Sequence, residues 1–346
     1  MNLNIFCVKE NDSLLATMKK INENSKGLVF VIDDENHLKG TITDGDIRRY
    51  ILSKGNINSI NKSVMNKEPK ILNEKNRRIA DKIMREFKIH AIPIVNENNQ
   101  IIDIYFDKDY KNNINLDVPV VIMAGGKGTR LYPYTQILPK PLIPINDKTI
   151  TEIIMDQFQS YGCNKFTMIV NYKKELIKAF FNDEEKKYAV SFVEEKEFLG
   201  TAGGLKLLEN DICSTFFLNN CDVLIEEDYS EILRYHKQSR NIITLVCALK
   251  KEIIPYGTIE TDETGQIIEL KEKPNFDFLI NTGLYVIEPE IFNEIPKNTF
   301  IHITDVIQIC MDKGFLVGVY PISEENWMDM GQLEELENMR QRLNGK

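Results

Sequence analysis

One stretch, Val118–Ile145, constrains the fold of this chain more than any other. It opens with the continuous apolar run Val120–Met123, which is typical of a strand buried on both faces of a parallel sheet. The run ends at GGKGTR, residues 125–130, where the glycines let backbone N–H groups approach a polyanion closely. Lys140 follows between two prolines. The stretch predicts a strand and a loop that can hold a triphosphate, although a tight strand-to-helix turn would explain the glycines alone.

The chain after this loop alternates between strand-like and helix-like segments. Apolar periodicity predicts, in order, a helix at 150–161, a strand at 166–170, a helix at 174–181, a strand at 190–194, a helix opening at 200–204 and a strand at 216–218. Residues 242–330 are richer in strands and could form one wall of a sugar pocket, and a charged helix follows at 332–343. We expect an α/β fold with a Rossmann-like doubly wound mixed sheet and ligands at the carboxyl ends of its strands.

Residues 1–112 form a separate predicted unit with an internal repeat. A helix at 14–21 and strands at 28–32 and 38–42 recur 63 residues later as a helix at 79–87 and strands at 91–95 and 101–106. The polar segment 111–115 predicts a short linker. The expected domains are therefore an α+β unit at 1–112 and a larger unit at 118–346.

Composition excludes several functional classes. The net charge of -9 argues against sequence-independent binding of nucleic acid, which needs a basic surface. The six cysteines are scattered and form no CxxC pair, so neither a zinc site nor a disulfide framework is expected. The sequence contains no apolar run of about 18 residues and no signal-peptide pattern. We therefore expect a cytoplasmic protein that does not enter a membrane.

The glycine loop and its surroundings resemble a known enzyme family. The matching positions are Ala124–Leu131, Pro133, Thr135 and Pro139–Pro144, which resemble the sugar-phosphate nucleotidyltransferases, or NDP-sugar pyrophosphorylases. The resemblance implies a Mg²⁺-dependent reaction in which an NTP and a sugar 1-phosphate give an NDP-sugar and pyrophosphate. Such a reaction needs charge neutralisation and in-line positioning more than covalent help from the protein.

The resemblance also implies roles for individual residues. Asp222 and Asp329 match the family's Mg²⁺ ligands, although position alone also allows a helix cap at Asp222 and a turn residue at Asp329. The residues implied for catalysis are Arg130, Lys140, Asp222 and Lys273. The residues implied for NTP binding are Met123, Ala124, Gly125, Gly126, Gly128, Thr129, Arg130, Lys140, Leu199 and Gly200, with the loop at 199–203 facing the base. The residues implied for the sugar phosphate are Gly257, Glu272, Lys273, Asn281 and Thr282.

The segment 40–49 resembles the end of a CBS domain, and two such repeats form a paired module. Thr43 and Asp46 match the positions that contact phosphate and ribose of a bound nucleotide in that family. The equivalents in the second copy are Phe106 and Asp109, so the threonine is absent there. A regulatory nucleotide at Thr43 and Asp46 is one expectation, and a simple cap on the helix that begins at Ile47 is the alternative.

The combination of both parts narrows the expected substrates. It is similar to the guanylyltransferases of sialic-acid-like sugar pathways, such as those acting on glucosamine 1-phosphate for legionaminic acid synthesis. This resemblance favours GTP and glucosamine 1-phosphate, or a related hexose 1-phosphate, as substrates for cell-surface glycan synthesis, and paired CBS modules favour a homodimer. The alternative function is a catalytically silent regulatory protein that senses adenine or guanine nucleotides through the CBS pair.

Overall fold

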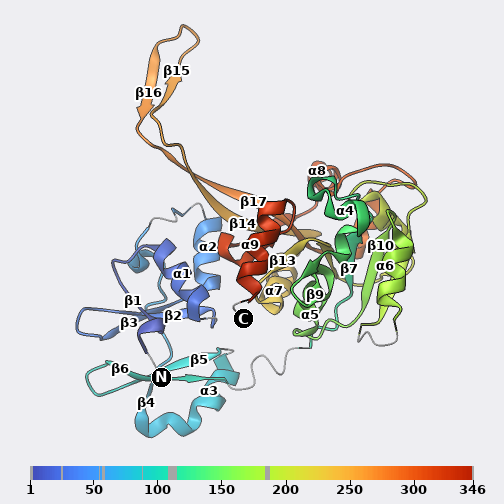
Figure 1. Cartoon of the computed structure of the whole chain (residues 1–346). Helices are drawn as coiled ribbons and strands as arrows, with labels where there is room; N and C mark the ends of the chain where they lie inside the picture. Colours follow the sequence, from blue (N-terminus) through green and yellow to red (C-terminus); the bar gives the residue numbers. More distant parts are fainter. Residues whose placement is uncertain are drawn as a thin grey trace. The chain divides into compact units, whose positions relative to one another are not determined.

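The computed structural model describes residues 3–24, 26–53, 55–56, 59–87, 89–107, 115–183 and 188–344 (Figure 1). The chain divides into two compact units, Met1–Asn113 and Ile114–Lys346. The predicted linker at 111–115 lies outside the described residues except for Asn115, and so does Asp109 of the second repeat.

The first unit contains the same small sheet twice. The first copy has β1 (Cys7–Lys9), β2 (Leu28–Ile32) and β3 (Leu38–Thr43), with the helices η1 (Leu3–Phe6), α1 (Leu14–Asn24), α2 (Asp44–Leu52) and η2 (Asn61–Ser63). The second copy has β4 (Leu72–Asn73), β5 (Ala91–Val95) and β6 (Ile101–Phe106), with the helices η3 (Glu74–Ile79) and α3 (Ala80–Phe87). In both copies the first pair of strands is parallel and the second is antiparallel. This shared topology confirms the predicted internal repeat.

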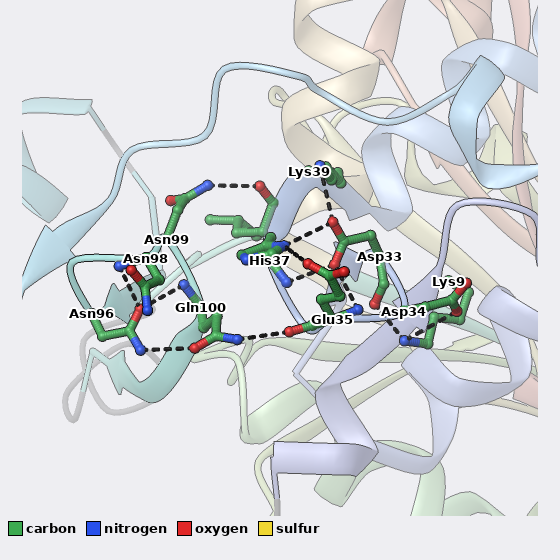
Figure 2. Close-up of polar contacts among 11 residues, drawn as sticks. Lys9, Asp33, Asp34, Glu35, His37, Lys39, Asn96, Asn98, Asn99 and Gln100 are labelled. Carbon is green, nitrogen blue, oxygen red and sulfur yellow. Dashed lines mark hydrogen bonds and ion pairs between the residues drawn. The ribbon is translucent and has the colours of Figure 1, made fainter.

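Equivalent turns join the two copies, as Figure 2 shows. The Leu38 N–H donates to the Asn99 carbonyl at 2.9 Å, and the Asn99 Nδ2 donates to the Leu38 carbonyl at 3.0 Å. Gln100 Nε2 donates to the Glu35 carbonyl at 2.8 Å. Side chains from both copies also share one apolar core, among them Phe30, Leu38, Val95 and Ile104. Each copy therefore covers apolar surface of the other.

The second unit is built on a seven-stranded mixed sheet in the order β11-β10-β7-β12-β17-β14-β18. Its strands are β7 (Val120–Ala124), β10 (Phe166–Val170), β11 (Val190–Glu194), β12 (Phe216–Asn220), β14 (Ile243–Ile253), β17 (Asn275–Ile287) and β18 (Val317–Ser323). β11, β10, β7 and β12 are parallel, β17 is antiparallel to β12 and β14, and β14 is parallel to β18. The fold is thus the expected α/β fold with a mixed sheet.

Helices cover both faces of this sheet. Val120 and Ile122 of β7 enter one apolar core, together with residues of α5 (Ile150–Gln159), α6 (Lys174–Phe181), α7 (Tyr229–Ser239) and α9 (Leu333–Asn344). Val121 and Met123 enter the other core, with residues of η6 (Gly203–Leu208), η7 (Pro289–Glu294) and α8 (Ile303–Asp312). Because strand side chains alternate between faces, an unbroken apolar run was the correct signal for a strand covered on both sides.

Short elements complete the second unit. They are η4 (Thr129–Leu131), α4 (Tyr134–Ile137), η5 (Lys140–Leu142), β8 (Pro144–Ile145), β9 (Lys148–Thr149), β13 (Val223–Ile225), η8 (Glu324–Asn326) and β19 (Trp327–Asp329). β15 (Thr258–Thr261) and β16 (Ile267–Lys271) form a hairpin at the end of an arm, the projecting ribbon of residues 250–280 in Figure 1. Within the part of the chain that the structure describes, no helix has both the length and the apolar character needed to cross a membrane.

Candidate active site

The carboxyl ends of four neighbouring parallel strands define the candidate site. Gly125 follows β7, Asn171 follows β10, Glu195 follows β11, and Asp222 comes two residues after β12. Because the strands are parallel, all four ends lie at one edge of the sheet, where open α/β sheets bind their ligands. The loop after the central strand β7 therefore lies between two acids. Glu195 follows β11, which is on the β10 side of β7, and Asp222 follows β12 on the other side.

Close packing and a hydrogen bond fix one side of the glycine loop, and its other side is exposed to solvent. Gly128 has a φ of +63°, and a Cβ there would lie 3.0 Å from Thr135 Cγ2 and 3.3 Å from the Cβ of Lys140. Thr135 Oγ1 donates to the Gly128 carbonyl at 2.8 Å. A Cβ at Gly126 would meet nothing within 4 Å, and Thr129 and Arg130 are exposed. The loop thus presents backbone and the side chains of Lys127, Thr129 and Arg130 to solvent from a fixed base.

Asp222 and Asp329 are brought together by a short antiparallel ribbon. β13 pairs with β19 so that Val223 lies opposite Asp329, and the Met330 N–H donates to the Asp222 carbonyl at 3.0 Å. Asp222 is 8% exposed, and Lys140 Nζ donates to its Oδ2. Asp329 Oδ1 is buried and has no hydrogen-bond partner among the described residues. Two acids 107 positions apart in sequence therefore meet beside the lysine of the PKP segment.

The charges of this cluster shift one another's pKa values. Burial and, next, the neighbouring Asp222 carboxylate raise the pKa of Asp329 to about 7. Burial by itself lowers the pKa of Lys140, but the carboxylates of Asp222 and Asp329 outweigh it, so the pKa stays above its ordinary value. One ammonium cannot neutralise two adjacent carboxylates fully. A buried carboxylate oxygen without a partner, next to a second acid, is a donor set that suits a hard divalent cation.

Glu195 is a candidate that the sequence patterns missed. It is 2% exposed, its Oε1 accepts from the Leu199 N–H at 3.3 Å, and its Oε2 has no partner among the described residues. Cβ atoms added at Gly125 and Gly204 would lie 2.7 and 2.6 Å from its carboxylate oxygens, so these glycines leave the room that it occupies. Burial raises the pKa of Glu195 to about 6. The sequence feature that could have identified Glu195 is its position directly after a strand whose carboxyl end lies at the ligand-binding edge of the sheet.

The loop at 199–203 lies over this carboxylate and is tied to a distant segment. Gly200 has a φ of +83°, and a Cβ there would lie 2.5 Å from the Ile301 carbonyl. The Ala202 N–H donates to the Ile301 carbonyl at 3.1 Å, and the Ile301 N–H donates to the Leu199 carbonyl at 3.0 Å. Only glycine fits at position 200 without strain, because both its φ and its close neighbour exclude a side chain.

Met123 and Ala124 belong to the strand rather than to an open surface. Both are buried in β7, and their side chains enter the two cores on opposite faces of the sheet. Neither side chain points freely into the candidate site, so a contact between a nucleotide and this pair requires backbone atoms.

The residues expected on the sugar side fall into two groups. Asn281 is exposed and donates from Nδ2 to the Tyr285 hydroxyl at 2.8 Å. Thr282 is buried, and its hydroxyl donates to the Val246 carbonyl at 2.8 Å. Gly283 has a φ of +93°, and a Cβ there would lie 2.4 Å from Asn220 Nδ2. This group therefore lies against the end of β12, two residues from Asp222.

The second group, Gly257, Glu272 and Lys273, lies on the arm. A Cβ at Gly257 would lie 3.1 Å from Glu272 Oε2, so these two residues are neighbours. All three are exposed. Among the described residues, no hydrogen bond or ion pair joins any of them to Asp222, Asp329 or Lys140. The structure thus brings the two aspartates and Lys140 together, but it does not bring this second group to them.

Thr43 and Asp46 form the cap of α2 in the first unit. The Thr43 N–H and hydroxyl donate to Asp46 Oδ2 at 2.9 and 2.7 Å, and the Asp46 N–H donates to Thr43 Oγ1 at 3.2 Å. This is a capping box, as the simpler of the two interpretations expected, although α2 begins at Asp44 rather than at Ile47. Both side chains are engaged with each other in the described structure.

Comparison with known proteins identifies the family of this chain. Residues 119–345 match the family model described as nucleotidyl transferase, and residues 1–53 match the CBS domain. The chain belongs to the nucleotidyl transferase family. It is 30% identical over 236 residues to a UTP--glucose-1-phosphate uridylyltransferase of Synechocystis sp., covering 62% of this chain and 60% of that protein. The resemblance drawn from the glycine loop is thereby confirmed at the level of the family.

The names of the similar proteins differ in the nucleotide base and in the sugar that they specify. The chain is 33% identical over 223 residues to a mannose-1-phosphate guanyltransferase of Yarrowia lipolytica, covering 61% of this chain and 60% of that protein. It is 33% identical over 175 residues to a D-glycero-alpha-D-manno-heptose 1-phosphate guanylyltransferase of Campylobacter jejuni, covering 50% and 77%. The chain therefore spans only 60% of the length of the Synechocystis and Yarrowia relatives.

A solved structure shows the same fold. HddC from Yersinia pseudotuberculosis matches with a TM-score of 0.52 and 23% identity, covering 65% of this chain and 99% of that one.

Proposed function

We propose that this nucleotidyl transferase family member makes an NDP-sugar and pyrophosphate from an NTP and a sugar 1-phosphate, with GTP as the preferred nucleotide. The observation that carries the reaction class is the cluster of Asp222, Asp329 and Lys140 at the sheet edge beside the glycine loop. Phosphoryl chemistry of this kind depends on such a concentration of charge and on fixed positioning.

The donor set fits Mg²⁺. Asp222 and Asp329 would hold the ion, because both are acids, they adjoin each other, and the buried Asp329 Oδ1 has no partner among the described residues. Mg²⁺ is typically bound by one or two carboxylates together with substrate phosphates. When bound, it would supply neutralisation of the negative charge on the phosphates.

The chain's own residues would position the reactants. An oxygen of the sugar 1-phosphate, which is largely dianionic near pH 7, attacks the α-phosphorus of the NTP. The bond from that phosphorus to the bridging oxygen breaks, and pyrophosphate leaves with the electron pair. Lys140, which donates to Asp222 in the described state, would turn toward the α-phosphate, and Arg130 would hold the outer phosphates. Lys273 would grip the phosphate of the sugar.

Glu195 supports the preference for GTP. A carboxylate accepts hydrogen bonds and donates none, and one of its oxygens is buried without a partner among the described residues. Guanine presents two adjacent donors, N1–H and the exocyclic amino group, which can satisfy both carboxylate oxygens. Uracil and thymine present one N–H between two carbonyl groups, and a carboxylate repels the oxygens of those carbonyl groups. A buried acid beneath the 199–203 loop is therefore suited to guanine.

The sugar is proposed from the named relatives and from the CBS architecture. The named relatives act on glucose, mannose or heptose 1-phosphate, and the CBS architecture favours glucosamine 1-phosphate for a legionaminic acid or similar glycan pathway. The first unit could still bind a regulatory nucleotide near Thr43 and Asp46. Because these two side chains cap α2, no described contact favours the alternative of a silent nucleotide sensor.

Pyrophosphate release from a panel of NTPs and sugar 1-phosphates tests the proposal. We expect release with GTP and glucosamine 1-phosphate in the presence of Mg²⁺, with slower release when UTP, dTTP or CTP replaces GTP. Absence of release from every pair would reject the reaction class, whereas faster release with UTP would reject only the assigned base.

A further inference from the structure

The loop that directly follows β10 connects three parts of the candidate site. Asn171 Nδ2 donates to the Glu195 carbonyl at 3.0 Å. The Tyr172 N–H donates at 3.3 Å to the carbonyl of Gly125, where the glycine loop begins. Lys173 Nζ reaches the end of α4, which lies beyond that loop in the chain. Three consecutive residues therefore join the acid on the base side of the site to the backbone on its phosphate side.

The side chain of Lys173 donates to the last carbonyls of α4. Its Nζ lies 2.5 Å from the Gln136 carbonyl oxygen, 2.8 Å from that of Ile137 and 3.5 Å from that of Thr135. The final carbonyls of a helix have no partner within the helix, and a cation there can hydrogen-bond them and complement their negative charge. One ammonium group therefore closes the carboxyl end of α4 from a different part of the chain.

Apolar packing holds α4 only weakly. Three of its four residues are exposed, and Ile137 is 75% exposed. A helix of one turn is unstable without outside contacts, because few hydrogen bonds offset the ordering of its backbone. Thr135 is buried and donates to the Gly128 carbonyl at 2.8 Å. Polar contacts therefore hold this turn, through Thr135 to the glycine loop and through its last carbonyls to Lys173.

The backbone at Lys173 does not favour a lysine. Its φ of +50° and ψ of +34° lie in the left-handed region, which glycine and asparagine adopt more easily than a residue with a long side chain. Lys173 also directly precedes α6, and a cation is unfavourable at the amino-terminal end of its own helix. The contact with α4 is the feature that accounts for a lysine here. A residue in a rare backbone conformation beside a ligand site is held there by its surroundings.

The end of α4 determines where two parts of the phosphate side lie. Lys140 follows Ile137 by three residues, and a Cβ at Gly128 would lie 3.3 Å from the Cβ of Lys140. A movement of α4 would therefore shift both the backbone of Lys140 and the glycine loop. Glu195 would not follow that movement, because its backbone is bonded to Asn171 after β10. The contact between the β10 loop and α4 thus sets the spacing of the two sides.

We infer that Lys173 is a positioning residue, which holds α4 and thereby fixes the phosphate side of the nucleotide site relative to its base side. It acts through Lys140 and the glycine loop and does not touch the reacting atoms. Under the proposed function, on which this inference rests, the contact keeps the Lys140 backbone where its ammonium group can reach the α-phosphate while the base lies at Glu195. Small displacements of a group that acts on the reacting atoms cost rate more than they cost binding.

Steady-state kinetics of the variant Lys173→Asn test the inference. Asparagine suits the left-handed backbone but cannot reach α4, and exposed polar contacts add little stability, so the midpoint of thermal unfolding should stay within about 3 °C of that of the natural chain. We expect kcat with GTP to fall about 10-fold, with an unchanged KM for the sugar 1-phosphate. A merely structural role would instead lower activity only together with stability.

Two further variants serve as controls. Lys173→Arg keeps a cation that can donate to the α4 carbonyls, and its kcat should stay within about 3-fold of the natural value. Lys174→Asn removes the neighbouring lysine, which donates to Glu194 at 2.5 Å, and should leave kcat unchanged. Equal losses in the Lys173→Asn and Lys174→Asn variants would overturn the inference, because the loss would then come from charge near α6 rather than from the contact with α4.

Hydrogen exchange tests the contact without turnover. The Leu138 amide donates to the Tyr134 carbonyl at 3.0 Å, and it should exchange at least about 5-fold faster in Lys173→Asn but at the natural rate in Lys174→Asn. Unchanged exchange in Lys173→Asn, or a natural kcat despite faster exchange, would overturn the inference. A natural chain that releases no pyrophosphate would reject the proposed function and with it the role of Lys173 in turnover, while the exchange result would still show whether Lys173 holds α4.

Discussion

The sheet edge around Asp222 and the arm that carries Lys273 present their candidate side chains in opposite ways. At the edge, Asp222 and Glu195 are buried. Lys140 Nζ donates to Asp222, and the Leu199 N–H donates to Glu195. On the arm, Glu272 and Lys273 are exposed on a ribbon that leaves the sheet. A buried, bonded side chain has already lost its rotamer freedom, whereas an exposed lysine still has that freedom to lose on binding. Under the proposed function, the nucleotide side of the site is preformed, and the position of the sugar side depends on what orders the arm.

The largest expected effect separates the edge from the arm directly. Asp222→Asn keeps the shape of the side chain but removes the charge that pairs with Lys140 and would hold Mg²⁺. We expect kcat/KM to fall at least 10³-fold, about 4 kcal/mol of transition-state stabilisation, with unchanged circular dichroism. Asp211→Asn, an exposed acid in the same unit, is the matched control and should retain activity. Near-normal turnover of the Asp222 variant at saturating Mg²⁺ would show that this edge of the sheet takes no part in the reaction.

A second effect tests the other side of the same edge. Glu195→Gln replaces an acceptor-only group with an amide that both accepts and donates, which suits uracil or thymine better than guanine. We expect kcat/KM for GTP to fall about 10- to 100-fold, while kcat/KM for UTP and dTTP falls less or rises. Equal losses for all nucleotides would show that Glu195 only supports the fold.

The arm should respond through substrate affinity. Lys273→Ala should raise KM for the sugar 1-phosphate about 10-fold and change kcat little, because the lost contact binds a phosphate that is present before and during the reaction. Lys271→Ala is the matched control on the same ribbon, since Lys271 pairs with Glu269 and should not touch substrate. A fall in kcat with unchanged KM would place Lys273 in the chemical step and erase this contrast.

The smallest effect concerns stability rather than turnover. Burial raises the pKa of Glu195 from 4.5 to about 6, so the neutral acid favours the fold at low pH and this contribution is lost as pH rises through about 6. Glu195→Gln avoids the cost of the buried charge and should stabilise the ligand-free protein by about 1–2 kcal/mol at pH 8, with no gain near pH 4. Thermal unfolding at the two pH values measures it. A variant that is less stable at pH 8 would mean that the carboxylate has a stabilising partner.

Two adjacent glutamates show where sequence reasoning ends. Glu194 and Glu195 lie in the charged run EEKE, which resembles a solvated surface. Glu194 pairs with Lys174 and Lys178, and these hydrogen bonds lower its pKa to about 2, whereas burial raises that of Glu195 to about 6. The two residues differ because successive side chains point to opposite faces at the end of β11. Which of the two is buried depends on the strand register and on Gly125 and Gly204, which are distant in sequence.

Other parts of the molecule were predictable because local chemistry determines them. The run Val120–Met123 predicted a strand covered on both faces, and the repeated pattern in residues 1–106 predicted two copies of one unit. The helix expected to open at 200–204 is a 3₁₀-helix that begins at Gly203, since glycines are poor α-helix formers. The strands at 256–259 and 267–272 were also predictable, but periodicity contains no information about whether a hairpin joins the sheet or projects from it.

The central claim is that Asp222 and Asp329 form one cation site that a bound nucleotide completes. Binding of Mn²⁺, measured by electron paramagnetic resonance with and without GTP, tests it most directly. The account predicts that GTP strengthens Mn²⁺ binding to the natural chain and that both Asp222→Asn and Asp329→Asn abolish this gain. Equal enhancement in the natural chain and in the two variants would contradict it.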